Sequence, residues 1–248
     1  MNKCAVILAG GEGKRMKSAI PKPMNEVLGK PMLRWVIDSV RAAGVENICV
    51  VTGFKKEITE DYLASLPFPV ETAYQSERLG TGHAVMMARA FLEKQGGDVV
   101  ILCGDAPFMD TATIRDALKQ HDEGDYSATV ISAMLDDPTG YGRIVRNADG
   151  TLNSIVEHKE ASEQIRAIRE VNSGGYWFDT ADLLSVLDKI TSNNSSKEYY
   201  LPDALYLLLN SGKKVGAFTA ASADTVLGAN DPQQLEELNR IAVAKGYC

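Results

Sequence analysis

A glycine-rich stretch near the start of the chain carries the residue types that bind phosphate. Leu8-Ala9-Gly10-Gly11-Glu12-Gly13-Lys14-Arg15-Met16 is followed, after a short gap, by Pro21-Lys22. Glycines let backbone N–H groups approach phosphate oxygens without a Cβ in the way. Arg15 and Lys22 add positive charge beside those amides. The spacing is neither GxGxxG nor GxxxxGK[ST], so an ordinary dinucleotide-binding fold and a P-loop are both disfavoured. The glycines alone would also suit a tight structural turn.

Two further polar side chains directly follow predicted strands. Asp105 comes after the apolar run 98–103, and Gln75 comes after the short strand 70–74. Ligands of doubly wound sheets bind at the carboxyl ends of such strands. A carboxylate there suits Mg²⁺, which takes one or two protein oxygens, and a glutamine amide can pair with a pyrimidine edge. Read alone, Gln75 could be an exposed polar residue, and Asp105 could cap the helix that begins at Thr111.

The elements that must position these residues alternate between strand-like and helix-like patterns in the first half of the chain. Short apolar runs predict strands over residues 4–9, 47–52, 70–74, 98–103 and 127–135. Helical spacing of apolar residues predicts helices over residues 31–43, 55–66, 82–94 and 111–121. This alternation predicts an α/β fold with a doubly wound, mostly parallel, Rossmann-like sheet.

The pattern changes in the second half. Strands over 142–146 and 154–157 flank a turn at Asp149-Gly150, and a further strand covers 171–178. These strands predict an inserted β layer over the open end of the sheet. The remaining elements are helices over 180–190, 202–210 and 232–244 and a strand over 214–218. We expect one domain over residues 1–229, with the insertion at about 136–178, and a C-terminal helical segment over 230–248.

Composition narrows the class of protein. The chain has 248 residues, 45% of them hydrophobic, and a net charge of -7, which disfavours a nucleic-acid binder. No apolar run approaches the roughly 20 residues that cross a bilayer, and the first strand leaves no room for a signal peptide. The four cysteines, Cys4, Cys49, Cys103 and Cys248, form no CxxC pair. We therefore expect a cytoplasmic protein without membrane or nucleic-acid partners. The sequence leaves its oligomeric state open.

The glycine-rich segment resembles the LAxGxGxRM…PK opening of the sugar nucleotidylyltransferase superfamily. Further blocks follow in that family's order: Gln75-Ser76-Glu77-Arg78-Leu79-Gly80-Thr81-Gly82-His83-Ala84, Leu102-Cys103-Gly104-Asp105-Ala106-Pro107, Thr139-Gly140-Tyr141-Gly142-Arg143-Ile144, Ile155-Val156-Glu157-His158-Lys159, Glu170-Val171-Asn172-Ser173-Gly174 and Glu198-Tyr199-Tyr200-Leu201-Pro202-Asp203. Together they are similar to the N-acetylglucosamine-1-phosphate uridylyltransferase domain of bacteria. The resemblance covers about residues 3–240.

The resemblance implies an Mg²⁺-dependent transferase that makes UDP-N-acetylglucosamine, a cell-wall precursor, and pyrophosphate from UTP and N-acetylglucosamine 1-phosphate. The implied catalytic residues are Arg15 and Lys22. The implied nucleotide-binding residues are Leu8, Ala9, Gly10, Gly11, Lys22, Gln75, Gly80 and Thr81. The implied sugar-binding residues are Cys103, Gly104, Gly142, Glu157 and Asn172. The implied metal ligands are Asp105 and Asn230.

Two of these residues also have plain structural interpretations. Asn230 lies close before Pro232, where it could cap a helix, and Glu157 could be an exposed strand residue paired with Lys159. The sequence departs from the family at Gly10, where alanine is usual, at Lys14, where threonine is common, at Arg78, where many members have glutamine, and at Cys103, where tyrosine is frequent. These changes bear on the identity of the sugar more than on the reaction class.

Alternative functions stay open. One is uridylyl or thymidylyl transfer to another sugar 1-phosphate, such as that of glucose or galactose. Another is a catalytically silent nucleotide-sugar sensor, against which Arg15, Lys22 and Asp105 together argue. Many bacterial relatives continue into a β-helix acetyltransferase built on hexapeptide repeats. Because such repeats are lacking here, we expect no acetyltransferase activity, and the trimer that the β-helix organises is not implied.

Overall fold

The computed structural model describes residues 2–247. Met1, where the expected domain begins, and Cys248, where the expected C-terminal segment ends, lie outside the described residues. The strands are β1 (Lys3–Leu8), β2 (Glu26–Val27), β3 (Lys30–Pro31), β4 (Asn47–Thr52), β5 (Glu71–Tyr74), β6 (Asp98–Cys103), β7 (Ala128–Met134), β8 (Arg143–Arg146), β9 (Leu152–Val156), β10 (Glu170–Asp179) and β11 (Val215–Thr219). The helices are α1 (Met32–Ala42), α2 (Lys56–Ala64), α3 (Thr81–Met87), α4 (Arg89–Gln95), α5 (Thr111–Gly124), α6 (Glu163–Arg166), α7 (Thr180–Leu187), α8 (Pro202–Asn210) and α9 (Pro232–Lys245). Short 3₁₀ turns cover Lys14–Met16, Lys22–Met24 and Ala223–Val226.

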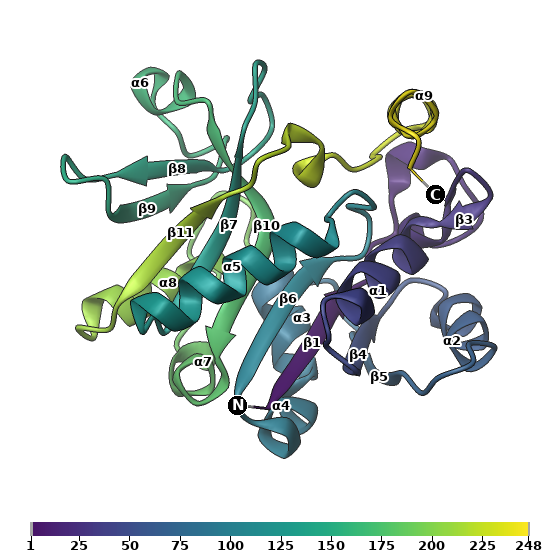
Figure 1. Ribbon diagram of the computed structural model, residues 1–248, viewed down its shortest axis with the longest axis horizontal. Helices are drawn as coiled ribbons and strands as arrows, with labels where there is room; N and C mark the ends of the chain where they lie inside the picture. The colour runs from purple at the N-terminus through teal and green to yellow at the C-terminus, as the bar shows by residue number, and fades with distance from the viewer. Residues whose placement is uncertain (1, 248) are drawn as a thin grey trace.

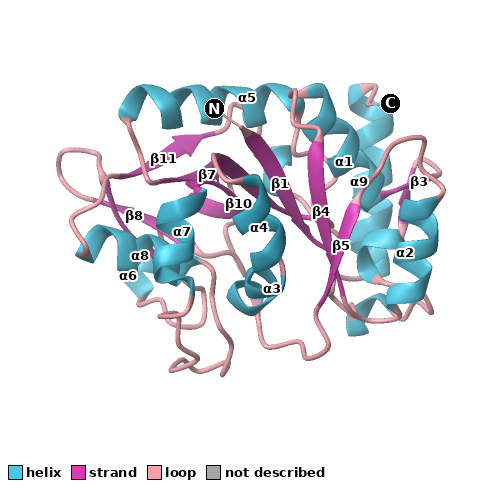
Figure 2. Ribbon diagram, turned by 90° about the horizontal axis from the view of Figure 1, so that it is seen from below, coloured by secondary structure: helices cyan, strands magenta, loops and turns pink. Residues whose placement is uncertain are grey.

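One large sheet forms the centre of the molecule, with strand order β11-β7-β10-β6-β1-β4-β5. Neighbouring strands are parallel except at β10, which is antiparallel to both β6 and β7. Helices α1 and α5 lie on one face, and α3, α4 and α7 lie on the other (Figure 2). This is the doubly wound, Rossmann-like arrangement that the alternating pattern predicts.

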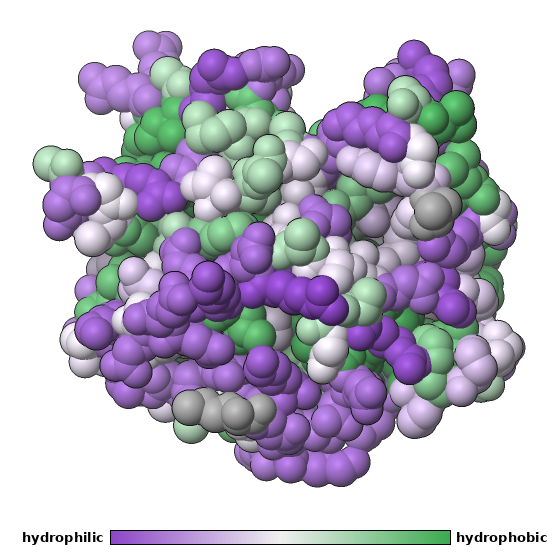
Figure 3. All heavy atoms as spheres, in the orientation of Figure 1, coloured by the Kyte–Doolittle hydropathy of each residue, from purple (hydrophilic) through white to green (hydrophobic). Residues whose placement is uncertain are grey.

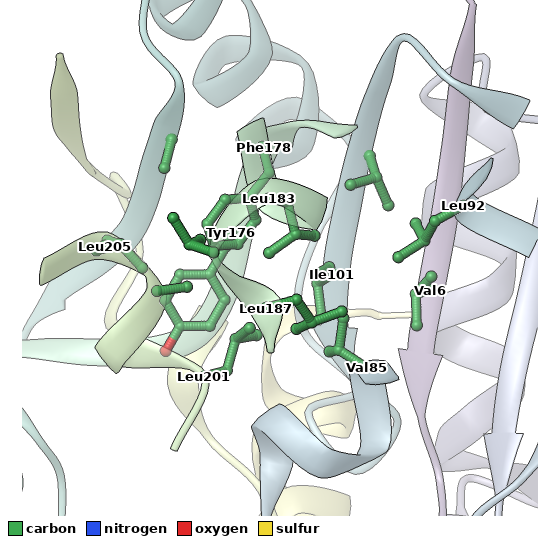
Figure 4. Packing of buried hydrophobic residues seen from close by; sticks show 14 of the residues in the cluster. Val6, Val85, Leu92, Ile101, Tyr176, Phe178, Leu183, Leu187, Leu201 and Leu205 are labelled. Atoms are coloured by element: carbon green, nitrogen blue, oxygen red, sulfur yellow. The ribbon is translucent and has the colours of Figure 1, made fainter. Parts of the chain in front are cut away.

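The two faces of β1 illustrate how the layers are held together. Cys4 and Val6 point into the core beneath α3, α4, α7 and α8, whereas Ala5 and Ile7 point toward α1 and α5. All four side chains are fully buried, as expected for a parallel strand covered on both faces. Figure 4 shows the first of these cores, in which side chains from helices and from β1, β6 and β10 interdigitate.

The placement of β10 differs from the sequence-based expectation. The strand ending near Phe178 was expected in the inserted layer, but it lies within the main sheet between β6 and β7. Tyr176, Trp177 and Phe178 are each at most 2% exposed, so both faces of this strand are covered. Only the hairpin β8–β9 extends off the sheet, attached to β10 through the Val171–Arg143 pair.

The predicted helix over 82–94 is in fact two helices. α3 and α4 meet at Ala88, whose N–H donates to the Val85 carbonyl at 3.0 Å, a 3₁₀-type bond that replaces the α-helical one. This segment contains no proline that would indicate a break, so helical periodicity alone predicts one continuous helix. No helix within residues 2–247 is both long enough and apolar enough to span a membrane.

Candidate active site

The strand register brings several loops to one edge of the sheet. Leu8, the last residue of β1, is paired with Val51 of β4 and with Cys103 of β6. The loops that follow these parallel strands therefore begin side by side. Figure 1 places the hairpin β8–β9 and helix α9 on opposite sides of the edge toward which β1 and β6 run. In the same view the surface is indented between these two parts (Figure 3).

Two adjoining cavities, each of about 280 Å³, open at this edge. The first is lined by Leu8, Gly10, Gly11, Lys22, Pro23, Gln75, Arg78, Gly80, Thr81, Ala84, Cys103, Asp105 and Glu198. The second is lined by Leu8, Thr81, Cys103, Gly140, Tyr141, Gly142, Glu157, Asn172, Ser173, Gly174, Tyr176, Glu198, Tyr200, Leu201 and Pro202. We call them the loop cavity and the hairpin cavity. Because they share Leu8, Thr81, Cys103 and Glu198, one ligand can extend from one into the other.

The loop cavity places a buried amide beside the glycine-rich segment. Gln75 is only 5% exposed, and its Nε2 donates to the Gly80 carbonyl at 3.1 Å and lies 3.1 Å from His83 Nδ1. A Cβ added to Gly10 would lie 2.9 Å from Gln75 Oε1. The absent side chain at Gly10 therefore gives the amide of Gln75 room and leaves its oxygen next to the loop backbone.

Residues 198–201, which are distant in sequence, are hydrogen-bonded to residues 79–82 beside both cavities. Tyr199 N–H donates to the Leu79 carbonyl at 2.7 Å, and Gly82 N–H donates to the Tyr199 carbonyl at 2.7 Å. Leu201 N–H donates to Thr81 Oγ1 at 3.0 Å. Gly80 has a φ of 110°, and a Cβ there would lie 2.5 Å from the Tyr199 oxygen. Only glycine fits this crossing, which joins residues 79–82 to 198–201.

Three segments also meet at Lys22. Its Nζ contacts Asp105 Oδ2 in an ion pair and donates to Asn230 Oδ1 at 2.7 Å. The side chains of Lys22 and Asp105 are 15% and 24% exposed, so this contact is largely shielded from water. Lys22 follows β1, Asp105 follows β6, and Asn230 precedes α9, which places residues far apart in sequence around one cationic nitrogen.

One of the residues that line the loop cavity, Arg78, forms an ion pair. Arg78 Nη2 donates to Glu12 Oε2 at 3.1 Å, and the guanidinium lies 6.0 Å from the Phe54 ring centre. Lys55 Nζ donates to the Ala19 carbonyl at 2.7 Å. Glu12 is an acidic residue within a loop otherwise suited to phosphate, and Arg78 offsets its charge.

The hairpin cavity presents a carboxyl group and a fixed amide. A Cβ added to Gly142 would lie 3.2 Å from Glu157 Oε1, and the Gly142 carbonyl accepts from Asn172 N–H at 2.9 Å. Asn172 Nδ2 donates to the Tyr176 hydroxyl at 2.7 Å, while its Oδ1 accepts from Gly174 N–H at 3.0 Å. The register of β10 shifts between Asn172 and Gly175, and this bulge turns Asn172 toward the cavity.

Burial raises the pKa of two cavity residues. It raises the pKa of the Glu157 carboxyl, and the charges of Asp203 and Glu198 raise that pKa further. Burial also raises the pKa of the Cys103 thiol to about 12, with Asp105 adding to the effect. Cys103 is therefore a neutral thiol at neutral pH and contributes shape to the cavity rather than a thiolate nucleophile.

Most of the sequence-predicted residues come together here, but four do not line either cavity. Asn230 is one of them, and it reaches the loop cavity only through its contact with Lys22. The other three are Arg15, Ala9 and Gly104. Arg15 is exposed in the 3₁₀ turn Lys14–Met16. Ala9 is buried, with its N–H donating to the Val51 carbonyl at 2.9 Å. Gly104 packs its backbone against the Leu8 carbonyl. These residues therefore act on a ligand only through movement or through the positions of their neighbours.

Sequence reasoning assigned no role to several residues that line the cavities, namely Arg78, Tyr141, Tyr176, Glu198, Tyr200 and Leu201. All of these except Tyr176 lie in motif blocks recognisable in the sequence. Tyr176 lies outside the quoted blocks, and its position depends on where β10 enters the sheet. Its place in the cavity could have been predicted only from the order of strands in the sheet.

The oxygens of Asp105 and Asn230 pass a simple test as Mg²⁺ ligands. Both contact the same ammonium nitrogen of Lys22, so a carboxylate and an amide oxygen already converge on one position of positive charge. Mg²⁺ prefers such hard oxygens and needs only one or two from the protein. Among residues 2–247, no three His, Cys, Asp or Glu side chains group as a metal centre. A carboxylate oxygen and an amide oxygen, the two ligand types expected for Mg²⁺, nevertheless lie together at Lys22.

Known proteins resemble this chain over most of its length. A sequence model of the nucleotidyl transferase family matches residues 4–225. The chain is 46% identical over 237 residues to the bifunctional protein GlmU of Acetivibrio thermocellus, covering 96% of this chain and 51% of that protein. It is 44% identical over 241 residues to the bifunctional protein GlmU of Geobacillus thermodenitrificans, covering 97% and 52%. The chain thus spans about half the length of these curated relatives.

A solved structure shares the fold. The crystal structure of UDP-glucose pyrophosphorylase complexed with UDP-glucose superposes with a TM-score of 0.82, covering 99% of this chain and all of the other, at 18% sequence identity. At that identity the likeness concerns the fold, and it supports the mostly parallel, Rossmann-like sheet with helices on both faces.

The crossing at Gly80 generates a stability prediction. Gly80→Ala places a methyl group against the Tyr199 carbonyl, so we expect a loss of more than about 3 kcal/mol in unfolding free energy. Gly212→Ala is the matched control, because Gly212 also has a positive φ but has nothing near its added Cβ. Its expected cost is only about 1–2 kcal/mol. Equal losses in urea unfolding would show that the crossing is not tightly packed.

The raised pKa of Glu157 predicts a pH-dependent effect of removing its charge. The folded state holds this proton more tightly than the unfolded chain, so the stability from Glu157 is present at low pH and is lost as pH rises through its folded pKa. Glu157→Gln should therefore raise the melting temperature at pH 8 but not at pH 4. Glu236→Gln, on the exposed surface of α9, is expected to leave the wild-type profile in place. A Glu157→Gln benefit that is the same at both pH values would contradict the burial argument.

Proposed function

Because this chain belongs to the nucleotidyl transferase family, we propose that it transfers a uridylyl group from UTP to N-acetylglucosamine 1-phosphate. The products are UDP-N-acetylglucosamine and pyrophosphate. The observation that carries this proposal is the pair of joined cavities at the carboxyl edge of the sheet. The loop cavity has the groups for a base and phosphates, and the hairpin cavity has the groups for a sugar.

The loop cavity suits the nucleotide. The uracil would lie against Gln75 and the backbone of Gly80 and Thr81, because an amide and backbone groups can meet both donors and acceptors of a pyrimidine. The triphosphate would follow the backbone of Gly10 and Gly11 toward Lys22. Tight anchoring of residues 79–82 by the 198–201 segment supports this arrangement, since the base site is then formed before the ligand binds.

The hairpin cavity suits a neutral amino sugar. Glu157 and the Asn172 amide would accept from and donate to hydroxyl and acetamido groups, and the Gly142 backbone is close enough to contact them. The raised pKa of Glu157 fits a partner for neutral hydroxyls. The Asn172 amide is held by Tyr176 and Gly174, so its orientation is set before binding.

The reaction is an in-line substitution at phosphorus. A phosphate oxygen of the sugar 1-phosphate forms a bond to the α-phosphorus of UTP, and the bond from that phosphorus to the β-phosphate bridging oxygen breaks. The nucleophile is already anionic, so no side-chain base is needed. Catalysis then consists of positioning and charge stabilisation. Lys22 lines the loop cavity and would offset charge on the phosphates; Arg15 would do so after its exposed side chain turns inward.

Asp105 and Asn230 would hold Mg²⁺. When bound, the ion supplies positive charge to the phosphate oxygens. Cys103 lines both cavities, and its neutral thiol would add no competing charge where the two substrates meet.

A second candidate is uridylyl transfer to glucose 1-phosphate. The specific observation in its favour is the shared fold with a UDP-glucose pyrophosphorylase, together with Cys103 at a position where the resembled family frequently has tyrosine. The substitution leaves a smaller side chain at the junction of the two cavities, which bears on the shape offered to the sugar.

The proposed function is tested by measuring pyrophosphate release with a panel of substrates. UTP, dTTP and ATP are each combined with the 1-phosphates of N-acetylglucosamine, glucose and galactose, with and without Mg²⁺. We expect the highest kcat/KM for UTP with N-acetylglucosamine 1-phosphate and no turnover without the metal. Preference for another sugar would replace the assigned substrate. Binding of a UDP-sugar without any pyrophosphate release would indicate a sensor.

The assigned cations are tested by substitution. Lys22→Ala and Arg15→Ala are each expected to lower kcat by roughly 10²–10³-fold, because each removes charge stabilisation from the transition state. Lys14→Ala removes an exposed charge from the same 3₁₀ turn as Arg15 and is expected to keep turnover within about twofold. Circular dichroism checks that each variant is folded. Near-normal turnover in a folded Lys22 or Arg15 variant would remove that residue from the mechanism.

A further inference from the structure

The ammonium of Lys22 lies where the two expected metal ligands converge. Its Nζ contacts Asp105 Oδ2 and lies 2.7 Å from Asn230 Oδ1. Mg²⁺ would sit about 2.0–2.1 Å from the same oxygens. The two cations cannot share this position, both because of space and because like charges repel strongly where water is largely excluded. A metal ion on Asp105 and Asn230 therefore requires Lys22 to leave.

The Asn230 acceptor is held in place without help from Lys22, and so is the backbone that carries Asp105. Asn230 N–H and Nδ2 both donate to Gln234 Oε1, at 2.8 and 3.0 Å, which aims the amide oxygen away from α9. Gly228 packs on the strand end, since a Cβ there would lie 2.7 Å from the Asp105 carbonyl oxygen. The loop before α9 is thus fixed against the Asp105 backbone. Removing the ammonium would leave the oriented Asn230 oxygen beside a carboxylate whose backbone is fixed.

The movement available to Lys22 is confined to its outer side chain. A Cβ added to Gly13 would lie 2.8 Å from Lys22 Cβ and 3.1 Å from Lys22 Cγ, so the base of the side chain packs on the glycine-rich loop. Its backbone is held by the 3₁₀ turn Lys22–Met24. Lys22 lines the loop cavity together with Gly10 and Gly11. The ammonium can therefore exchange its protein oxygens for phosphate oxygens without a change in the loop.

We propose that Lys22 is the resident cation of the Asp105–Asn230 position in the free protein, and that a divalent cation enters only when a triphosphate draws the ammonium away. This rests on the proposed function, because the triphosphate supplies the competing oxygens. The consequence is an order of binding: the free protein binds the metal poorly, and the metal arrives with the nucleotide. Lys22 then has two successive positions, first on the metal ligands and afterwards on the phosphates.

The test measures the affinity of the nucleotide-free protein for Mn²⁺. Electron paramagnetic resonance reports the concentration of the free ion. Wild type is expected to bind Mn²⁺ weakly. Lys22→Met keeps an unbranched side chain one atom shorter and removes its charge, so binding should tighten by roughly tenfold or more. Lys22→Gln, a second neutral variant, should show the same gain. Adding Asp105→Asn to Lys22→Met should abolish the gain, because the carboxylate is then lost.

Equal Mn²⁺ affinity in wild type and in both folded Lys22 variants would overturn the proposal. So would a gain that survives Asp105→Asn, since the ion would then bind elsewhere. The readout is independent of turnover. If wild type released no pyrophosphate but the Lys22 variants gained Mn²⁺, the proposed function would fail while the shared cation position stood. If turnover were normal but the affinities equal, only the present inference would fail.

Discussion

The register of three parallel strands is the constraint on which the site depends. Leu8 is opposite both Val51 and Cys103, so the chain leaves β1, β4 and β6 at one level. A slip of one residue in β1 would exchange the faces to which Ala5 and Val6 point, and both are fully buried. The same burial that stabilises the sheet therefore fixes where the glycine-rich loop and Asp105 begin. The site is a consequence of core packing before any ligand is involved.

Contacts over long sequence distances complete what the register begins. The segment around Tyr199 is hydrogen-bonded to residues 79–82, and the loop before α9 packs on Asp105. Each contact brings a late part of the chain to an early strand end. Charged groups are paired in the same region. The Lys22 ammonium contacts one oxygen of Asp105 and one of Asn230, and Arg78 forms an ion pair with Glu12. The free protein thus balances its own charges at the place where we propose that phosphates and a metal ion bind.

Much of the fold could be predicted from the sequence, because buried parallel strands are short apolar runs and their loops carry the polar residues. Asp105 follows such a run after Gly104, and Asp149-Gly150 marks the β8–β9 turn. Gln75 follows the short, mostly exposed strand β5. The position of β10 could not be predicted this way, since periodicity does not reveal strand order. Nor does a motif show side-chain direction: Arg15 matches the family pattern but is exposed outside the cavities. The break at Ala88 carries no proline, so it too required the structure.

We propose that one ligand spans the two cavities with its phosphates between Lys22 and the Asp105–Asn230 oxygens. The most direct measurement is a crystal structure of the protein with UTP, a divalent cation and a non-reactive analogue of the sugar phosphate. We expect uracil at Gln75, the sugar between Glu157 and Asn172, the ion on Asp105, and the Lys22 ammonium moved onto a phosphate oxygen. A nucleotide bound away from Gln75, or a Lys22 ammonium still on Asp105 with the ion bound elsewhere, would contradict it.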